Sequence, residues 1–184
     1  DGGLPFSTIS TLARITAEVL QLHDIHAQIT PGEIVSGDLI WHLEEASGSA
    51  NLLVSKVNPQ HIDSRIRAAQ VSGEIKLEGN AQTQSAHIQL KDNSISFNAA
   101  IKRDGERVTL EQFNLQRSKS QLAGQGKFDF GNEQSFELSG NLENFNIADF
   151  IQAPDSNLNA AIQLSGQLSP RISGILKYTI QKSR

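Results

Sequence analysis

The chain comprises 184 residues with a formal net charge of -4, and 38% of its residues are hydrophobic but only 5% are aromatic. That length suits one large all-β domain or two small ones, and the apolar content is lean for a compact core. Lysine and arginine are scattered rather than clustered, which argues against a nucleic-acid surface. The absence of cysteine excludes a disulfide framework, a thiolate zinc site and a cysteine nucleophile.

Membrane-spanning and targeting segments are not predicted within the sequence. No stretch approaches the roughly 18 consecutive apolar residues of a transmembrane helix, and no positively charged start leads into an apolar run. The chain starts at Asp1 and ends at Arg184 in the middle of its residue pattern. We therefore expect it to be a piece of a longer protein.

The N-terminal region fits two kinds of element. Leu12, Ile15, Val19 and Leu22 fit one face of a helix, and Ser10 or Thr11 could cap it. The same region also forms alternating apolar blocks rich in Ile, Val and Thr, residues that are enriched in strands. The composition favours strands here, and the helix stays as the alternative.

From residue 37 onward, apolar residues alternate with polar ones in run after run. Because successive side chains of a strand point to opposite faces, this alternation predicts strands with one apolar face. The apolar positions are Gly37, Leu39, Trp41 and Leu43; Val71, Gly73, Ile75, Leu77 and Gly79; Ala86, Ile88 and Leu90; and Ile95, Phe97, Ala99 and Ile101. Turns are predicted at 91–93 and 103–106, and a parity slip predicts a bulge around Glu111 and Gln112.

The C-terminal half repeats the pattern. The predicted strands here carry Leu122, Gly124, Gly126, Phe128 and Phe130; Phe136, Leu138, Gly140 and Leu142; and Leu158, Ala160, Ile162, Leu164, Gly166 and Leu168 on their apolar parity. Turns are predicted at 131–134 and 169–171, a final strand at 172–180, and one or two helical turns at 146–152, before Pro154. Strands joined by short turns predict an antiparallel meander.

Glycine recurs on the apolar parity of these strands. The positions are Gly37, Gly73, Gly79, Gly124, Gly126, Gly140 and Gly166. Two interpretations stay open at this point. Glycine in a strand marks bulges, kinks or close approach of backbones, and it also leaves volume and permits curvature. In the second case the bare positions would make room for lipid acyl chains.

Catalytic and metal-binding signals are weak. His23 and His26 lie three residues apart, which straddles the two faces of a strand, and His42, His61 and His87 stand alone. Solvated histidines are the better interpretation. The Gly124-Gln125-Gly126 triplet lies inside a predicted strand with no helix after it, so it does not fit a nucleotide fingerprint. We expect no enzyme, no metal and no cofactor.

The run VTLEQFNLQRSKSQLAGQGKFDFGNEQSFELSGNLENFNIADF at 108–150, followed by LNAAIQLSGQLSPRISGIL at 158–176, resembles the repeating unit of the AsmA-like superfamily, most of all that of the TamB family. The segment 15–57 is similar in a looser form, so the resemblance covers nearly the whole chain. It implies an elongated, curved antiparallel sheet folded into an open trough, a β-taco, with an apolar interior. The whole of 1–184 is then one repetitive segment, with a looser part at 1–65 and a regular part at 66–184.

The resemblance also implies a function. Members of this superfamily are anchored in the inner membrane of Gram-negative bacteria and span the periplasm. They are implicated in phospholipid transport to the outer membrane and, in the TamB family, in the assembly of outer-membrane proteins with a partner barrel. The expected partners are therefore phospholipid acyl chains and an outer-membrane barrel protein, with the chain itself soluble and its parent protein membrane-anchored. An alternative is a non-enzymatic scaffold that binds client strands by β-augmentation.

The residues expected to line the lipid groove are those with large side chains on the apolar parity. They are Leu39, Trp41, Leu43, Ile75, Leu77, Ile88, Leu90, Phe97, Ile101, Leu122, Phe128, Phe130, Phe136, Leu138, Leu142, Ile162 and Leu164.

Overall fold

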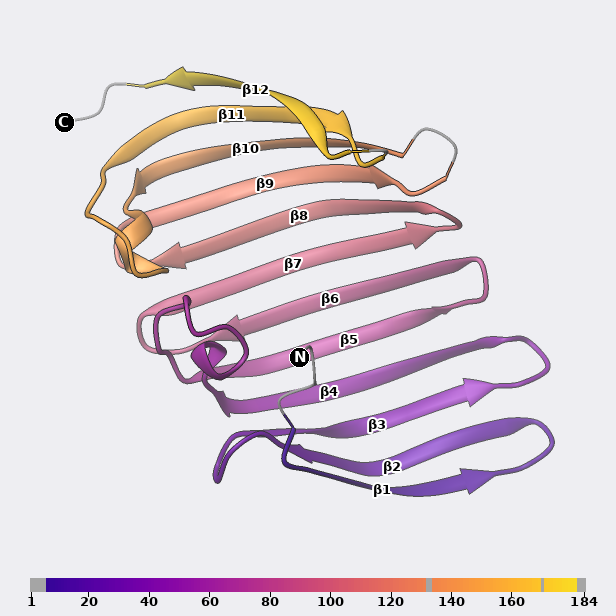
Figure 1. Cartoon of the computed structure of the whole chain (residues 1–184). Coiled ribbons are helices and arrows are strands. Elements are labelled where there is room, and N and C mark those ends of the chain that lie inside the picture. Colours follow the sequence, from indigo (N-terminus) through magenta and orange to yellow (C-terminus); the bar gives the residue numbers. More distant parts are fainter. Residues whose placement is uncertain (1–5, 132–133, 170, 182–184) are drawn as a thin grey trace.

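The computed structural model describes residues 6–131, 134–169 and 171–181. Their strands form one antiparallel sheet of twelve strands that follow one another in chain order (Figure 1). The predicted all-β meander is therefore confirmed. The first and last strands are the two edges, so the sheet is not closed into a barrel. Stacking of the strands at about 4.8 Å gives the sheet a length of roughly 50 Å.

The strands are 8 to 11 residues long. Their bounds are β1 Thr8–Ile15, β2 Val19–Gln28, β3 Ile34–His42, β4 Ser47–Val57, β5 Val71–Asn80, β6 Thr83–Lys91, β7 Ile95–Asp104, β8 Arg107–Arg117, β9 Ser120–Asp129, β10 Ser135–Phe145, β11 Leu158–Gln167 and β12 Ser173–Ile180. The sheet runs without a break from β4 into β5, so the strands before and after residue 65 belong to one sheet.

Cross-strand register places the alternating apolar residues on one face. Residues directly opposite each other in an antiparallel pair have side chains on the same side of the sheet. One such row reads Leu52, Ile75, Ile88, Ala99 and Phe113 from β4 to β8. We call the side of the sheet that carries these rows the apolar face, and the opposite side the polar face.

The N-terminal region is a β-hairpin, so the strand prediction is confirmed and the helical alternative is wrong. Strands β1 and β2 pair from Thr8 with Gln28 to Ile15 with Leu20. The turn between them is held by Thr16, whose Oγ1 accepts a hydrogen bond from the backbone N–H of Val19 at 3.0 Å. Cross-strand pairing therefore decides a segment whose apolar spacing also fits a helix.

Bulges interrupt several strand pairs. The one predicted around Glu111 and Gln112 is confirmed, because the register of β8 against β9 shifts between Leu110 and Phe113. Three further bulges contain a residue with positive φ whose backbone N–H is bonded to a side chain of the next strand. These pairs are Asp24 with Asp38 at 3.3 Å, Lys56 with Ser72 at 2.9 Å, and Asn144 with Asn159 at 2.8 Å.

Two long loops follow the bulges at Lys56 and Asn144. Residues 58–70 connect β4 to β5 and contain the 3₁₀ turn η1 (Pro59–His61), and residues 146–157 connect β10 to β11 and contain η2 (Ile147–Asp149). The short helical element predicted at 146–152 is thus confirmed as a single 3₁₀ turn. An asparagine caps each turn, since the side chain of Asn58 accepts from Gln60 N and that of Asn146 from Ala148 N.

The two loops meet each other although six strands separate their starting points. Ile66 and Ile151 form a β-bridge, and the backbone N–H of Arg67 donates to the carbonyl of Phe150 at 2.8 Å. Both loops lie in front of the sheet at the same strand ends in Figure 1. We call 58–70 and 146–157 the bridging loops.

The predicted turns at 91–93 and 103–106 are confirmed by the bounds of β6, β7 and β8. Those at 131–134 and 169–171 include residues 132, 133 and 170, which lie outside the described residues. Asp92 stabilises its turn by accepting hydrogen bonds from the backbone N–H groups of Ser94 at 2.6 Å and Ile95 at 2.8 Å. Burial raises the pKa of Asp92, but the backbone hydrogen bonds outweigh this effect and bring its pKa to about 2.

Candidate functional site

The residues expected to line a groove lie together on the apolar face. Those inside strands all occupy its cross-strand rows: Leu39, Trp41, Ile75, Leu77, Ile88, Leu90, Phe97, Ile101, Leu122, Phe128, Phe136, Leu138, Leu142, Ile162 and Leu164. Leu43 and Phe130 immediately follow β3 and β9, and both side chains are exposed. The register therefore brings together residues that are spread over more than 120 positions of the sequence.

One end of the apolar face is covered by the bridging loops. Here Ile29, Val54, Val57 and Val71 form a buried cluster, and Ala69 of the first bridging loop packs against it. The second bridging loop is held against β10 as well, because the rings of Phe145 and Phe150 stack with centroids 5.2 Å apart. We call this the covered end.

The second bridging loop is also tied down by a buried hydroxyl. Ser120 at the start of β9 is 1% exposed. Its Oγ donates to the carboxylate of Asp149 and accepts from the backbone N–H of Asn146 at 2.9 Å. A polar group at this depth is stable only when it is hydrogen-bonded, so these contacts fix the loop to the sheet.

The first bridging loop contacts the turn before β3 through a histidine side chain. His61 Nδ1 lies 2.8 Å from Glu33 Oε1, and Glu33 is buried. Burial raises the pKa of Glu33, but hydrogen bonds with His61, Thr30 and the backbone of Asn58 lower it below its ordinary value. His61 is exposed, as the sequence-based interpretation expected, but its side chain is not isolated, because it contacts Glu33. Among the described residues, no group of three or more potential metal ligands gathers at one place.

At the opposite strand ends the apolar face is open and hollowed. A cavity of about 300 Å³ lies there. Two neighbouring rows of the apolar face line it, namely Leu39, Ala50, Leu77, Ala86 and Ile101, and Trp41, Gly48, Gly79, Gln84 and Arg103. Between these rows lie Ile40, Ser49, Glu78 and Ser85, which also line the cavity but belong to the row whose side chains are on the polar face. We call this cavity the rim hollow and these strand ends the open end. Leu77 is 38% exposed here, although its cross-strand neighbour Ala50 is buried like Val54 at the covered end.

Charge is distributed unequally between the two faces of the sheet. At the paired strand positions, the charged side chains on the apolar face are Arg103 and Arg117, and both are cations. Arg117 lies at the covered end, where its Nη2 reaches the carbonyl of Ala68 in the first bridging loop at 3.5 Å. Carboxylates at cross-strand paired positions, such as those of Glu74 and Glu137, are on the polar face.

Close approach of neighbouring backbones accounts for the glycines of the apolar parity, except for Gly126, where the closest atom belongs to the side chain of Leu138. A Cβ built on Gly73 would lie 1.9 Å from the carbonyl oxygen of Gln89, and one on Gly124 would lie 2.6 Å from that of Ser139. Distances this short are incompatible with any side chain, so these positions need glycine whether or not a ligand binds. Of the two interpretations of the glycine pattern, the structure supports the close approach of strands.

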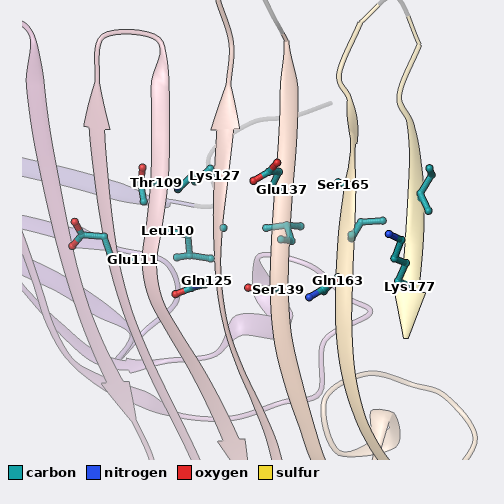
Figure 2. A pocket seen from close by; sticks show the side chains of 14 residues that line it. Thr109, Leu110, Glu111, Gln125, Lys127, Glu137, Ser139, Gln163, Ser165 and Lys177 are labelled. Carbon is teal, nitrogen blue, oxygen red and sulfur yellow. The ribbon is translucent and has the colours of Figure 1, made fainter. Parts of the chain in front are cut away.

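A larger hollow of about 590 Å³ lies on the polar face of β8 to β12. Figure 2 shows polar side chains of successive strands around it, among them Lys127, Glu137, Ser139, Gln163 and Lys177. The register places these polar residues in the two rows that flank the cross-strand row Leu110, Gly126, Leu138 and Leu164. That row belongs to the apolar face and borders the hollow with its main chain. Mixed charges and amides do not suit an acyl chain, so its size does not make it the better lipid site.

No protein-family model, curated protein or solved structure matches this chain. The helical elements within 6–131, 134–169 and 171–181 are too short and too polar to cross a membrane.

Proposed function

We propose that this chain is a non-enzymatic lipid-conduit segment whose apolar face forms a groove for phospholipid acyl chains. The observation that carries the proposal is the continuity of this face. One row of it can be followed from Ile25 on β2 through Leu52 and Ile88 to Tyr178 on β12. A second sheet packed on this face, as in a β-sandwich, is not present among the described residues.

Physical chemistry favours an apolar ligand for such a face. Burial of apolar surface contributes about 25 cal/mol per Å², so an uncovered apolar strip that crosses the whole sheet is stabilised by any acyl chain that lies on it. Between Arg103 at the open end and Arg117 at the covered end, the paired positions of the apolar face carry no charged side chain. An acyl chain can therefore lie on this part of the face without burying an unpaired charge. The open end leaves it accessible from solvent.

The cellular setting of the proposal rests on the resemblance of residues 108–150 and 158–176 to the AsmA-like superfamily. We place the chain in the periplasm of a Gram-negative bacterium, as part of a protein anchored in the inner membrane. Its roles there are phospholipid transport to the outer membrane and support of outer-membrane protein assembly, with an outer-membrane barrel protein as partner. The twelve-stranded open sheet is compatible with these roles.

A second candidate function has its own observation. The edge strands β1 and β12 are exposed along their whole length, and β12 carries exposed Ile175, Leu176, Tyr178 and Ile180. An edge strand with unpaired backbone groups and apolar side chains can add a strand of another protein. This favours a scaffold that binds client strands by β-augmentation, and both functions can reside in one sheet.

Photo-crosslinking in cells tests the conduit. A photoreactive residue at Phe128 or Leu138, on the apolar face, should crosslink to phospholipid. The matched controls are the neighbouring positions Lys127 and Glu137, which face the polar side and should give no lipid adduct. Equal labelling at both parities, or labelling of protein only at β12, would favour the scaffold function instead.

Leu138→Arg separates an open groove from a closed core. In an open groove the long arginine side chain can carry its charge to water along the trough, so we expect a soluble, folded chain whose parent protein no longer maintains outer-membrane integrity. In a closed core the same charge costs several kcal/mol and unfolds the domain. An aggregated variant together with no lipid adduct at Phe128 would overturn the conduit.

A further inference from the structure

The rim hollow combines an apolar wall with one cation. Its lining includes Leu39, Trp41, Leu77 and Ile101, and Arg103 lines it as well. Arg103 follows Ile101 on the same parity of β7 and lies opposite Gln84 of β6. The cavity thus has the two parts that an amphiphile needs, a place for a chain and a place for a charge.

Arg103 is not neutralised by a carboxylate. Among the described residues it forms no ion pair, and its Nε donates to the carbonyl oxygen of Gly105 at 2.8 Å. The nearby Arg107, on the polar face, is paired with Asp129 at 3.3 Å. The hydrogen bond to Gly105 fixes the side chain near the turn while the two terminal nitrogens remain as donors, which is the geometry that binds phosphate in a bidentate manner.

We propose that the rim hollow binds one phospholipid molecule, with an acyl chain against Leu39, Trp41 and Leu77 and the phosphodiester on Arg103. The proposal rests on the lipid-conduit function and adds the position of the headgroup. A volume of about 300 Å³ is at the lower limit of ligand cavities, so the hollow takes part of one chain while the rest follows the apolar face. The headgroup then stays at the open end, in contact with water.

We infer that the charged group of the ligand is anionic, because the paired positions of the apolar face carry no acidic side chain. An anionic group that enters at Arg103 meets Gln84 and Val108 as cross-strand neighbours, neither of which repels it. The second cation of this face, Arg117, is at the covered end and bonded to a bridging loop. Charge and apolar surface therefore coincide at the rim hollow and at no other exposed place among the paired positions of this face.

Trp41 provides the measurement, since it is the only tryptophan of the chain and lines the rim hollow. Its fluorescence is followed during titration with a short-chain phosphatidylglycerol that carries bromine on its acyl chain, because bromine quenches tryptophan at contact. A diacylglycerol with the same brominated chains lacks the phosphate, and glycerol phosphate lacks the chains. We expect quenching by both brominated lipids, at lower concentrations for the phospholipid, and none by glycerol phosphate.

Arg103→Gln should raise the apparent Kd for the brominated phospholipid about tenfold, the effect of one charge-assisted hydrogen-bonded contact, and should leave that for diacylglycerol unchanged. Arg107→Gln is the control, since it removes a neighbouring arginine from the polar face. If Arg103→Gln leaves phospholipid binding unchanged, or Arg107→Gln weakens it equally, the headgroup site is wrong and the conduit stands. If neither brominated lipid quenches Trp41 in the unmodified chain, acyl chains do not bind at the rim hollow, and this result contradicts the lipid-conduit function there.

Discussion

The two ends of the apolar face are built from the same kind of strand and differ in what lies on them. At the covered end the bridging loops bury Val54, Val57 and Val71 into a small core. At the open end the same strands β4 and β5 continue to Ala50 and Leu77, which line the rim hollow instead. Alternation alone therefore produces an apolar face, and the loops decide which part of it becomes core.

This difference separates stability from ligand binding along single strands. Residues under the bridging loops gain their burial from the protein, so their substitution should change the free energy of unfolding. At the open end Leu77 remains 38% exposed in the free chain and gains further burial only from a ligand, whereas the smaller Ala50 beside it is already buried. Three substitutions at and around the covered end test this division.

Val54→Asp should have the largest effect. It places a carboxylate in the buried cluster with Val57 and Val71, where no partner is available, and we expect it to lower the free energy of unfolding by about 3 kcal/mol or more. Leu53→Asp is the matched control, because Leu53 is the adjacent residue, is 54% exposed and faces the polar side. Its effect should stay within about 0.5 kcal/mol. Urea unfolding measures both, and similar losses would mean that the covered end is not a core.

Ser120→Val should have an intermediate effect. The substitution keeps the approximate shape of the side chain but leaves the partly buried backbone N–H of Asn146 and the carboxylate of Asp149 without this partner. We expect a loss of about 2 kcal/mol, seen as a lower Tm. Ser139→Val, on the polar face of β10, should leave Tm nearly unchanged. An unchanged Tm for Ser120→Val would show that the second bridging loop does not depend on this contact.

Asp92→Asn should have the smallest effect, and one that depends on pH. Asp92 accepts from the backbone N–H of Gln70, the last residue of the first bridging loop, and its pKa of about 2 lies below the ordinary value of 3.8. A carboxyl with a depressed pKa stabilises the fold above about pH 4, and this contribution is lost as the pH falls towards 2. The variant should be less stable by about 1 kcal/mol at pH 7 and equal to the unmodified chain near pH 2. A constant difference across this range would contradict the assignment.

The strands could be predicted from the sequence because their signal is local. Each apolar run, such as 71–79 or 86–90, carries its period of two within a few residues, and short turns fix the order of the strands. The same alternation assigns each residue to the apolar or the polar face of the sheet. The placement of Leu77 and Leu138 on the apolar face could therefore be expected before the register was known.

The bridging loops could not be predicted in the same way. The pairing of Ile66 with Ile151 joins segments far apart in the chain, and neither segment shows alternation. The contact of His61 with Glu33 was missed for the same reason, because it depends on how the first loop folds back. The bulge residues Asp24, Lys56 and Asn144 have positive φ without being glycine, so they gave no signal in the residue pattern.

Native mass spectrometry of the purified chain tests the central claim most directly. We expect to see the 20.0 kDa chain together with a species heavier by the mass of one or more phospholipids, carried through purification on the apolar face. Incubation with phospholipid should increase this species, and Leu138→Arg should reduce it. A bare chain before and after incubation, at a concentration where its fold is intact, would contradict the lipid conduit and favour the scaffold that acts through its edge strands.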